Sequence, residues 1–93
     1  MLFEWYEEKR LENLNKHGID FLDAKEIWQG EVLEVPSEQQ EHGERRHLAY
    51  GVLDGRIIAV VVTWRGEARR LISARRARRH ERQDYQDVFG TGR

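Results

Sequence analysis

The hydrophobic positions at the start of the chain predict a short strand followed by a helix. Residues 2–6 alternate weakly between polar and apolar side chains and are rich in aromatic residues, which favours a strand. Glu7–His17 is acidic in its first turn and basic in its last, as the helix dipole prefers, and Leu11 and Leu14 give it an apolar stripe. Gly18 follows where a left-handed C-cap glycine belongs, so we expect the helix to end there.

A second helix, a short strand and a loop are predicted next. Asp20 is suited to cap a helix over residues 21–29, in which apolar side chains recur at helical spacing. Residues 32–35 are apolar enough for a short strand, and Pro36 is expected to end it. Residues 37–44 are polar and acidic, and we expect them to form an exposed loop.

The middle of the chain predicts three consecutive antiparallel strands, at residues 45–53, Arg56–Arg65 and residues 68–74. The pair Asp54–Gly55 is a strong signal for a two-residue hairpin turn, and the next turn is centred on Gly66–Glu67. Residues 57–62 are continuously apolar, as in a strand that is covered on both faces. The two helices near the N-terminus can cover one of these faces.

The last predicted element is a helix from Arg75 to about Val88, with Ser73 as its N-cap. Residues 90–93 are expected to fray. The whole pattern predicts one α+β domain over residues 1–93. Its parts are a short N-terminal strand, two helices, an antiparallel sheet of about three to four strands and a C-terminal helix.

Composition limits the class of protein. With 39% hydrophobic and 35% charged residues the chain is expected to fold, and the absence of cysteine excludes disulfides, thiolate zinc sites and a cysteine nucleophile. The longest apolar run, residues 57–62, is far shorter than the roughly 18 residues of a membrane span. The first residues lack the basic-then-apolar order of a signal peptide. We therefore expect a cytoplasmic protein that makes no membrane contact.

The net charge of −1 conceals a division of charge along the chain. Residues 1–44 contain four basic and twelve acidic residues, a net charge of −8. Residues 45–93 contain twelve arginines and five acidic residues, a net charge of +7. Eight of these arginines lie between Arg65 and Arg82. Such a basic segment indicates a negatively charged partner.

The arginine-rich end of the last predicted strand is the first candidate site. Arg75 and Arg76 lie beside the predicted helix N-terminus, where unpaired N–H groups and guanidinium groups both bind phosphate. The alternative is a solvated helix surface stabilised by ion pairs. Because arginine is used there without lysine, we favour a ligand that needs forked hydrogen bonds, and both nucleic acid and an acidic protein fit that description.

Four histidines supply the proton carriers that cleavage of an RNA backbone would need. His17 follows Lys16 at a predicted helix end, where it can equally serve the helix dipole. His42 lies in the predicted loop, and His47 and His80 lie close to arginines in the sequence. No two of them have the spacing of a metal site, so no metal ion is expected. The set is compatible with a metal-free ribonuclease, but no single spacing requires one.

Three blocks in order resemble the BrnT family of bacterial type II toxin–antitoxin systems. They are the aromatic and acidic opening FEWYEEKRLENLN, the KHG segment with the following Phe21, and the segment T-x-R…I-S-A-R-R-A near the C-terminus. The resemblance covers residues 2 to about 85. It implies a small ribonuclease with a RelE-like fold that arrests translation and needs no cofactor or metal.

The resemblance also implies partners. A BrnA-like antitoxin with a ribbon-helix-helix DNA-binding part neutralises such a toxin, and the complex represses its own operon. The antitoxin then binds operator DNA, the toxin contacts this DNA only indirectly, and the two proteins form a hetero-oligomer. On this interpretation the basic half faces substrate RNA, and a negatively charged segment of the antitoxin can occlude it.

The family's blocks also suggest site residues. The candidate catalytic residues are Lys16, His17, Arg65, Ser73, Arg75, Arg76, Glu81 and Tyr85. The candidate RNA-binding arginines are Arg69, Arg78, Arg79 and Arg82. The phosphate would be bound by Arg65, Arg75 and Arg76. The base would be His17 or Glu81, and the proton donor Tyr85 or His17. The alternative function is a non-catalytic basic module that binds RNA or an acidic protein.

Overall fold

The computed structural model describes residues 1–41 and 44–90, which form a five-stranded sheet with helices at one face and at one end. The strands are β1 (Leu2–Glu4), β2 (Leu33–Glu41), β3 (Glu44–Leu53), β4 (Arg56–Arg65) and β5 (Ala68–Arg76). Their order across the sheet is β1-β5-β4-β3-β2. The short β1 pairs with β5 in parallel, and all other neighbours are antiparallel. The predicted α+β architecture is confirmed, while its likeness to RelE stays a prediction.

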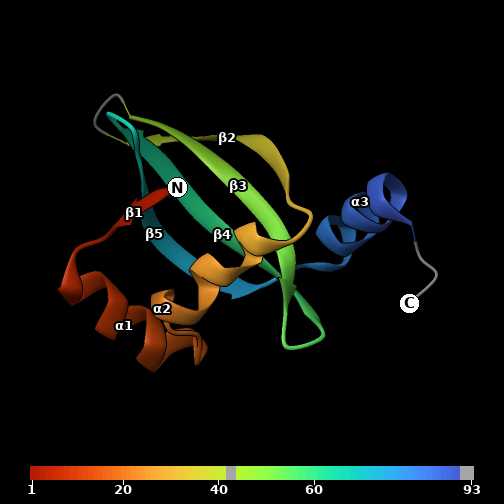
Figure 1. The fold of residues 1–93 in the computed structure, drawn as a ribbon, viewed down its shortest axis with the longest axis horizontal. Coiled ribbons are helices and arrows are strands. Elements are labelled where there is room, and N and C mark those ends of the chain that lie inside the picture. The colour runs from red at the N-terminus through yellow and green to blue at the C-terminus, as the bar shows by residue number, and fades with distance from the viewer. Residues whose placement is uncertain (42–43, 91–93) are drawn as a thin grey trace.

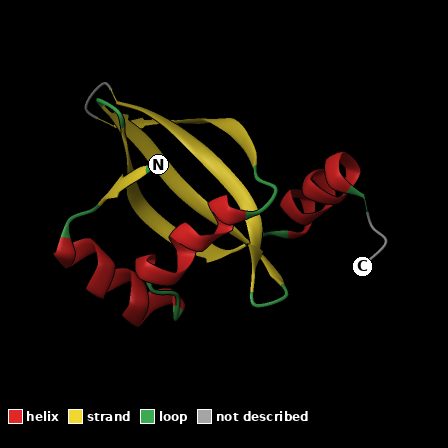
Figure 2. Ribbon diagram, viewed as in Figure 1, coloured by secondary structure: helices red, strands yellow, loops and turns green. Residues whose placement is uncertain are grey.

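The helices are α1 (Glu7–His17), α2 (Phe21–Ala24) with the 3-10 helix η1 (Lys25–Gln29) directly after it, and α3 (Arg79–Phe89). Figure 1 shows α1 and α2 together against one side of the sheet, and α3 beyond the end of β5, away from α1. Figure 2, coloured by secondary structure, shows that the other side of the sheet carries no helix along most of its length. None of the helices in residues 1–41 and 44–90 is long and apolar enough to cross a membrane.

The predictions for the first two helices are largely confirmed. The bounds of α1 are those predicted, and Gly18 ends it with a φ of 72°, the left-handed conformation that glycine adopts readily. Asp20 caps α2 by accepting a hydrogen bond from the backbone N–H of Leu22. The predicted helix over residues 21–29 is regular only as far as Ala24 and then tightens into η1, as helix ends often do.

The prediction that Pro36 ends a short strand and that a loop follows is wrong. β2 continues through Pro36, which lies opposite His47, and reaches Glu41 after a shift in register. Proline is tolerated because β2 is the edge strand of the sheet, where an N–H can be spared. The rest of the predicted loop includes Glu44, which begins β3, and His42, which lies outside the described residues.

The predicted start of the last helix is also wrong. β5 extends to Arg76, so Ser73, Arg75 and Arg76 are strand residues, and α3 begins only at Arg79 with Arg78 before it. The strand continues because residues 73–76 pair with β4, from Val61↔Ser73 to Ile58↔Arg76. Pairing with a neighbouring strand outweighs the helical propensity of an arginine- and alanine-rich segment.

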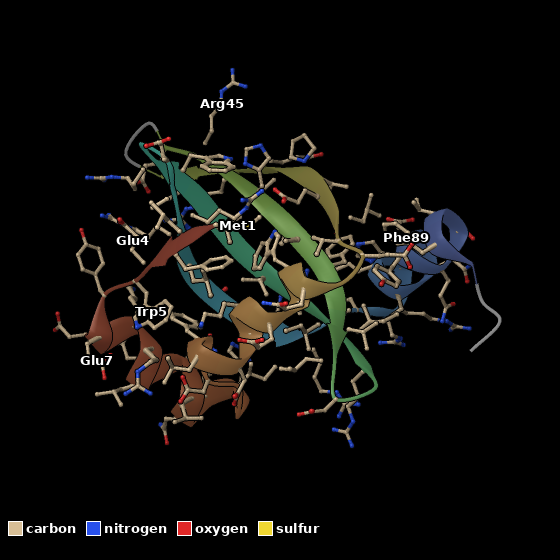
Figure 3. All side chains as sticks on the ribbon, in the orientation of Figure 1. Met1, Glu4, Trp5, Glu7, Arg45 and Phe89 are labelled. Atoms are coloured by element: carbon tan, nitrogen blue, oxygen red, sulfur yellow. The ribbon has the colours of Figure 1, made fainter. Side chains whose placement is uncertain are left out.

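The core lies mainly between the sheet and the helices α1, α2 and η1. Phe21, Ala24 and Ile27 from the helices pack on alternate residues of the strands, such as Val60 and Leu71. A smaller cluster on the opposite face centres on Tyr50, Ala59 and Tyr85. In Figure 3, Phe89 lies on the side of α3 that faces the strands, where it joins this second cluster.

The buried side of α1 is polar. Leu11 and Leu14, its apolar stripe, are exposed, whereas Asn13 is 6% exposed. The Asn13 amide donates to the backbone carbonyls of Ile19 and Ala74 at 2.9 Å, and its oxygen accepts from the Ala74 N–H at 3.0 Å. Because β1 pairs only with residues 68–70 of β5, no strand lies beside β5 at Ala74 on that edge. The Asn13 side chain makes the hydrogen bonds to Ala74 that a neighbouring strand would otherwise make. α1 is thereby fixed to the sheet by hydrogen bonds.

Candidate active site

A groove of about 750 Å³ lies on the face of the sheet that α1 and α2 leave open. Its floor is formed by residues of β2, β3, β4 and β5. One wall is the C-terminal end of α1, with Lys16 and His17, and another is the start of α3, with Arg78 and His80. The groove is therefore lined by basic groups from segments that are far apart in the sequence, together with the acidic side chains of Glu38, Glu81 and Asp84.

The register of the strands determines which residues lie side by side on the floor of the groove. Tyr50, Ala59 and Arg75 lie side by side across β3, β4 and β5. Leu48, Val61 and Ser73 form the next row, about 7 Å along the strands. Because side chains alternate between faces, both rows point to the open face.

Arg75, one of the basic groups of the groove, is held by a carboxylate. Its two terminal nitrogens donate to the two carboxylate oxygens of Glu81, at 2.7 and 2.9 Å. Glu81 also accepts the backbone N–H of Arg78 at 2.7 Å, which caps the start of α3. Since Arg75 is on β5 and Glu81 is on α3, this forked ion pair fixes the helix to the strand.

Glu81 is ionised in spite of being 1% exposed. Burial raises its pKa, but the hydrogen bonds from Arg75 and Arg78, together with the charges of Arg75 and His80, lower it to about 2. A carboxylate with so low a pKa is a poor proton acceptor at neutral pH. In this geometry Glu81 holds Arg75 in place, and the assignment of Glu81 as a base loses support.

His17, unlike Glu81, has a pKa that suits a proton acceptor at neutral pH. Its pKa is lowered from the ordinary value by burial and by the positive charges of Lys16 and Arg75. A histidine with a lowered pKa is neutral at pH 7 and can accept a proton. Of the two bases suggested by the sequence, His17 is the one whose electrostatics suit the role.

Tyr50 is a buried polar group in the floor of the groove. Burial and the negative charges of Glu81 and Asp84 raise its pKa, so its hydroxyl stays protonated at neutral pH. A side-chain hydrogen bond to Glu81 contributes to the same rise in pKa, and because an ionised carboxylate can only accept, the Tyr50 hydroxyl donates to Glu81. Tyr50 is not among the site residues that the sequence suggested, although its position between Leu48 and Val52 already indicated a shared face for Leu48 and Tyr50.

Arg46 is a second groove residue that the sequence analysis did not select. It lies on the same strand as Leu48 and Tyr50, two and four residues before them, and therefore on the same face. The alternation of side chains along β3 was the sequence signal that placed Arg46 on this face.

Several candidates suggested by the sequence lie away from the groove. The Tyr85 hydroxyl donates to the backbone carbonyl of Glu31 at 3.0 Å, and its ring packs on Phe89. Arg69 lies on the other side of the sheet, where it contacts the rings of Trp28 and Trp64. These contacts give Tyr85 and Arg69 structural roles.

The remaining arginines are distributed around the molecule. Arg65 is near the far end of β4, about 13 Å along the strand from the row that contains Ser73, and it forms an ion pair with Glu44 at 3.7 Å. Arg82 donates to the backbone carbonyl of Ala77 at 2.7 Å. Arg76 and Arg79 are exposed at the end of β5 and the start of α3. The structure thus brings together Lys16, His17, Ser73, Arg75, Arg78 and Glu81 from the candidate set.

Metal ligation has little support in this arrangement. Within residues 1–41 and 44–90 there is no group of three or more histidine, aspartate or glutamate side chains that could hold a metal ion. The groove instead offers fixed cations and a neutral imidazole. Such a set can bind a phosphodiester and move a proton on and off it.

Comparison with known proteins identifies the family. The family model described as "Ribonuclease toxin, BrnT, of type II toxin-antitoxin system" matches residues 5–81, most of the chain. That span contains Lys16, His17, Arg75 and Glu81, the residues that the structure gathers in and around the groove. No curated protein matches the chain. The resemblance found in the sequence is confirmed, and the chain belongs to the BrnT family of ribonuclease toxins of type II toxin–antitoxin systems.

Proposed function

We propose that this protein cleaves RNA in the groove on the open face of its sheet. The observation that carries the proposal is the convergence of Lys16, His17, Arg75, Arg78 and His80 in one cavity. The positive charges of Lys16, Arg75 and Arg78 attract the phosphodiester backbone, and the family is named for ribonuclease activity. RNA also carries the 2′-hydroxyl that a nearby base can activate.

His17 is the proposed base. It accepts the proton of the 2′-hydroxyl while that oxygen attacks the adjacent phosphorus. The bond between phosphorus and the 5′-oxygen then breaks, and the products are a 2′,3′-cyclic phosphate and a 5′-hydroxyl. The lowered pKa of His17 supports this role because the imidazole must be neutral before it can act.

His80 is the proposed acid, which returns a proton to the leaving 5′-oxygen. It lies on the α3 wall, whereas His17 lies on the α1 wall, so the two imidazoles approach the phosphate from different elements. The earlier candidate, Tyr85, has its hydroxyl on the Glu31 carbonyl and does not line the groove.

The cations of the groove supply the electrostatic part of catalysis. Lys16, Arg46 and Arg78 can stabilise the additional negative charge on the pentavalent phosphate. Arg75 is proposed to bind the same phosphate with the N–H groups that neither Glu81 nor the Arg76 carbonyl occupies. Glu81 is a positioning residue, since it fixes Arg75 and the start of α3 with one carboxylate.

The test is cleavage of single-stranded RNA by the purified chain in EDTA, because we propose that no metal ion is needed. His17→Asn keeps the size and polarity of the side chain, and we expect it to lower kcat by about 10²–10⁴-fold. Arg45→Ala is the matched control: this exposed arginine is next to Arg46, and Figure 3 shows it extending away from the sheet. RNA left intact by the wild-type chain, or cleaved equally by His17→Asn, would contradict the proposal. Binding without cleavage would favour a non-catalytic RNA-binding module.

We also propose the biological setting that the family implies. Cleavage of RNA in the cytoplasm would arrest translation, and a BrnA-like antitoxin would form a hetero-oligomer with the toxin and neutralise it. An acidic segment of that antitoxin fits the basic groove and would compete with RNA for it. Operator DNA would be bound through the antitoxin. Competition between the antitoxin and an uncleavable RNA for the wild-type chain tests whether they share the groove.

A further inference from the structure

A second cavity, of about 440 Å³, lies at the other end of the open face. Its polar lining is mostly basic and aromatic: Tyr6, Lys9, Arg46, Arg65 and Arg70, with Glu44 as its acidic member. Arg46 and Ile72 line both this cavity and the groove, so the two are adjacent to each other. A ligand that occupies the groove can therefore extend into the second cavity.

Tyr6 is held at the edge of this cavity with its ring exposed. The guanidinium carbon of Arg70 lies 4.6 Å from the centre of the Tyr6 ring, and Arg70 donates a hydrogen bond to the Tyr6 hydroxyl at 2.9 Å. Arg70 is itself anchored by Glu4 at 2.7 Å. Tyr6 is nevertheless 55% exposed. An ordered, exposed aromatic ring beside a cation is a suitable platform for stacking a nucleic-acid base.

The cations around Tyr6 are available to phosphate. Arg65 pairs with Glu44 at 3.7 Å and Lys9 pairs with Glu12 at 3.9 Å. Both cations are more than half exposed, and long ion pairs between exposed side chains contribute little. A phosphate group can therefore replace these carboxylates without much loss.

We propose that this cavity is a distal subsite for single-stranded RNA, in which a base stacks on Tyr6 and flanking phosphates bind Lys9, Arg46 and Arg65. The inference rests on the proposed cleavage in the groove and adds a substrate-length preference to it. Because Arg65 lies about 13 Å along β4 from the row that contains Ser73, the RNA has to extend beyond the scissile phosphate to reach it. An acidic peptide would use the cations but would not need the ring.

The experiment compares two RNA substrates, a dinucleotide that fills only the groove and an oligonucleotide of about ten nucleotides. We expect Tyr6→Ala to raise KM for the oligonucleotide about tenfold, to leave its kcat unchanged, and to have no effect on the dinucleotide. Tyr6→Phe keeps the ring and should behave like the wild-type chain. Arg65→Ala should also weaken oligonucleotide binding and reduce the slope of log K against log[salt] by about 0.7. Arg45→Ala serves as the matched arginine control.

Binding separates this inference from the proposed cleavage. An oligonucleotide with a 2′-deoxy sugar at the scissile position binds without being cut, so fluorescence anisotropy measures the subsite even if no cleavage occurs. Weaker binding by Tyr6→Ala but not by Tyr6→Phe supports the subsite whatever the outcome for catalysis. Equal binding by Tyr6→Ala and the wild-type chain overturns it, and a loss with Arg65→Ala alone would assign the cavity to an acidic ligand without stacking. An equal loss with Arg45→Ala would also overturn it.

Discussion

Replacing Glu81 by glutamine tests the link between the fold and the groove most directly. The substitution keeps the shape of the side chain but removes the negative charge that pairs with Arg75. The fall in pKa from 4.5 to about 2 on folding corresponds to about 3 kcal/mol of stability at neutral pH. Glutamine retains one acceptor oxygen, so we expect Glu81→Gln to reduce the free energy of unfolding by about 2–3 kcal/mol.

The pH dependence gives the prediction its specific signature. A carboxyl group whose pKa is lowered by folding stabilises the folded state above its unfolded pKa, and this stability is lost as the pH falls through the folded value. The difference between the wild-type chain and Glu81→Gln should therefore be full at about pH 7 and should disappear progressively between about pH 5 and pH 2. Thermal denaturation followed by circular dichroism measures it, with an expected decrease in Tm of about 10–20 °C at neutral pH.

The control is Glu67→Gln, which removes an exposed glutamate from the turn between β4 and β5. We expect this variant to stay within about 0.5 kcal/mol of the wild-type chain. Equal Tm values for Glu81→Gln and Glu67→Gln would refute the assignment of Glu81 as the fixed partner of Arg75. A difference that persists unchanged at low pH would refute the electrostatic origin of the effect. Arg75→Ala combined with Glu81→Gln should be less destabilising than the sum of the two single changes.

Three further predictions concern the elements around the groove. Asn13→Ala removes three hydrogen bonds and leaves the backbone N–H and C=O of Ala74 unpaired, so urea denaturation should show a loss of about 2–4 kcal/mol. If His17 is the base, the pH profile of kcat/KM should have an acidic limb below the ordinary histidine pKa, because the pKa of His17 is lowered; a limb above that value would contradict the proposed role. Gly18→Ala should cost about 1 kcal/mol, because Gly18 has a φ of 72°, whereas Gly30→Ala at a negative φ should cost less.

Local patterns allowed much of the fold to be predicted. The bounds of α1, the caps at Gly18 and Asp20 and the bounds of β4 all depend on residues next to one another in the sequence. The extension of β2 past Pro36 does not, because it depends on pairing with β3 across the sheet. The end of β5 depends in the same way on β4. Sequence patterns carry little information about such distant pairing.

The sequence indicated some of the residues that line the groove, but it did not indicate that they lie together, because this also depends on contacts between distant segments. Lys16 and His17 were selected at a helix end, and Arg75 and Glu81 in an arginine-rich segment, but no local signal placed these groups in one groove. The low pKa of Glu81 and the lowered pKa of His17 arise from contacts between different elements. The roles of the two candidate bases could therefore be distinguished only in the folded chain.

The division of charge along the sequence acquires a different meaning in the structure. Arg65, Arg69, Arg70 and Arg75 form ion pairs with Glu44, Glu34, Glu4 and Glu81. Three of these acids come from the acidic half of the chain, so three of the twelve arginines of residues 45–93 join the two halves. The cations that line the groove include Lys16 from the acidic half and Arg46 from β3 as well as Arg78. The sheet thus brings together the basic surface that RNA or an antitoxin would contact. A count of the arginines in residues 65–82 overestimates the charge of this surface and omits Lys16 of α1.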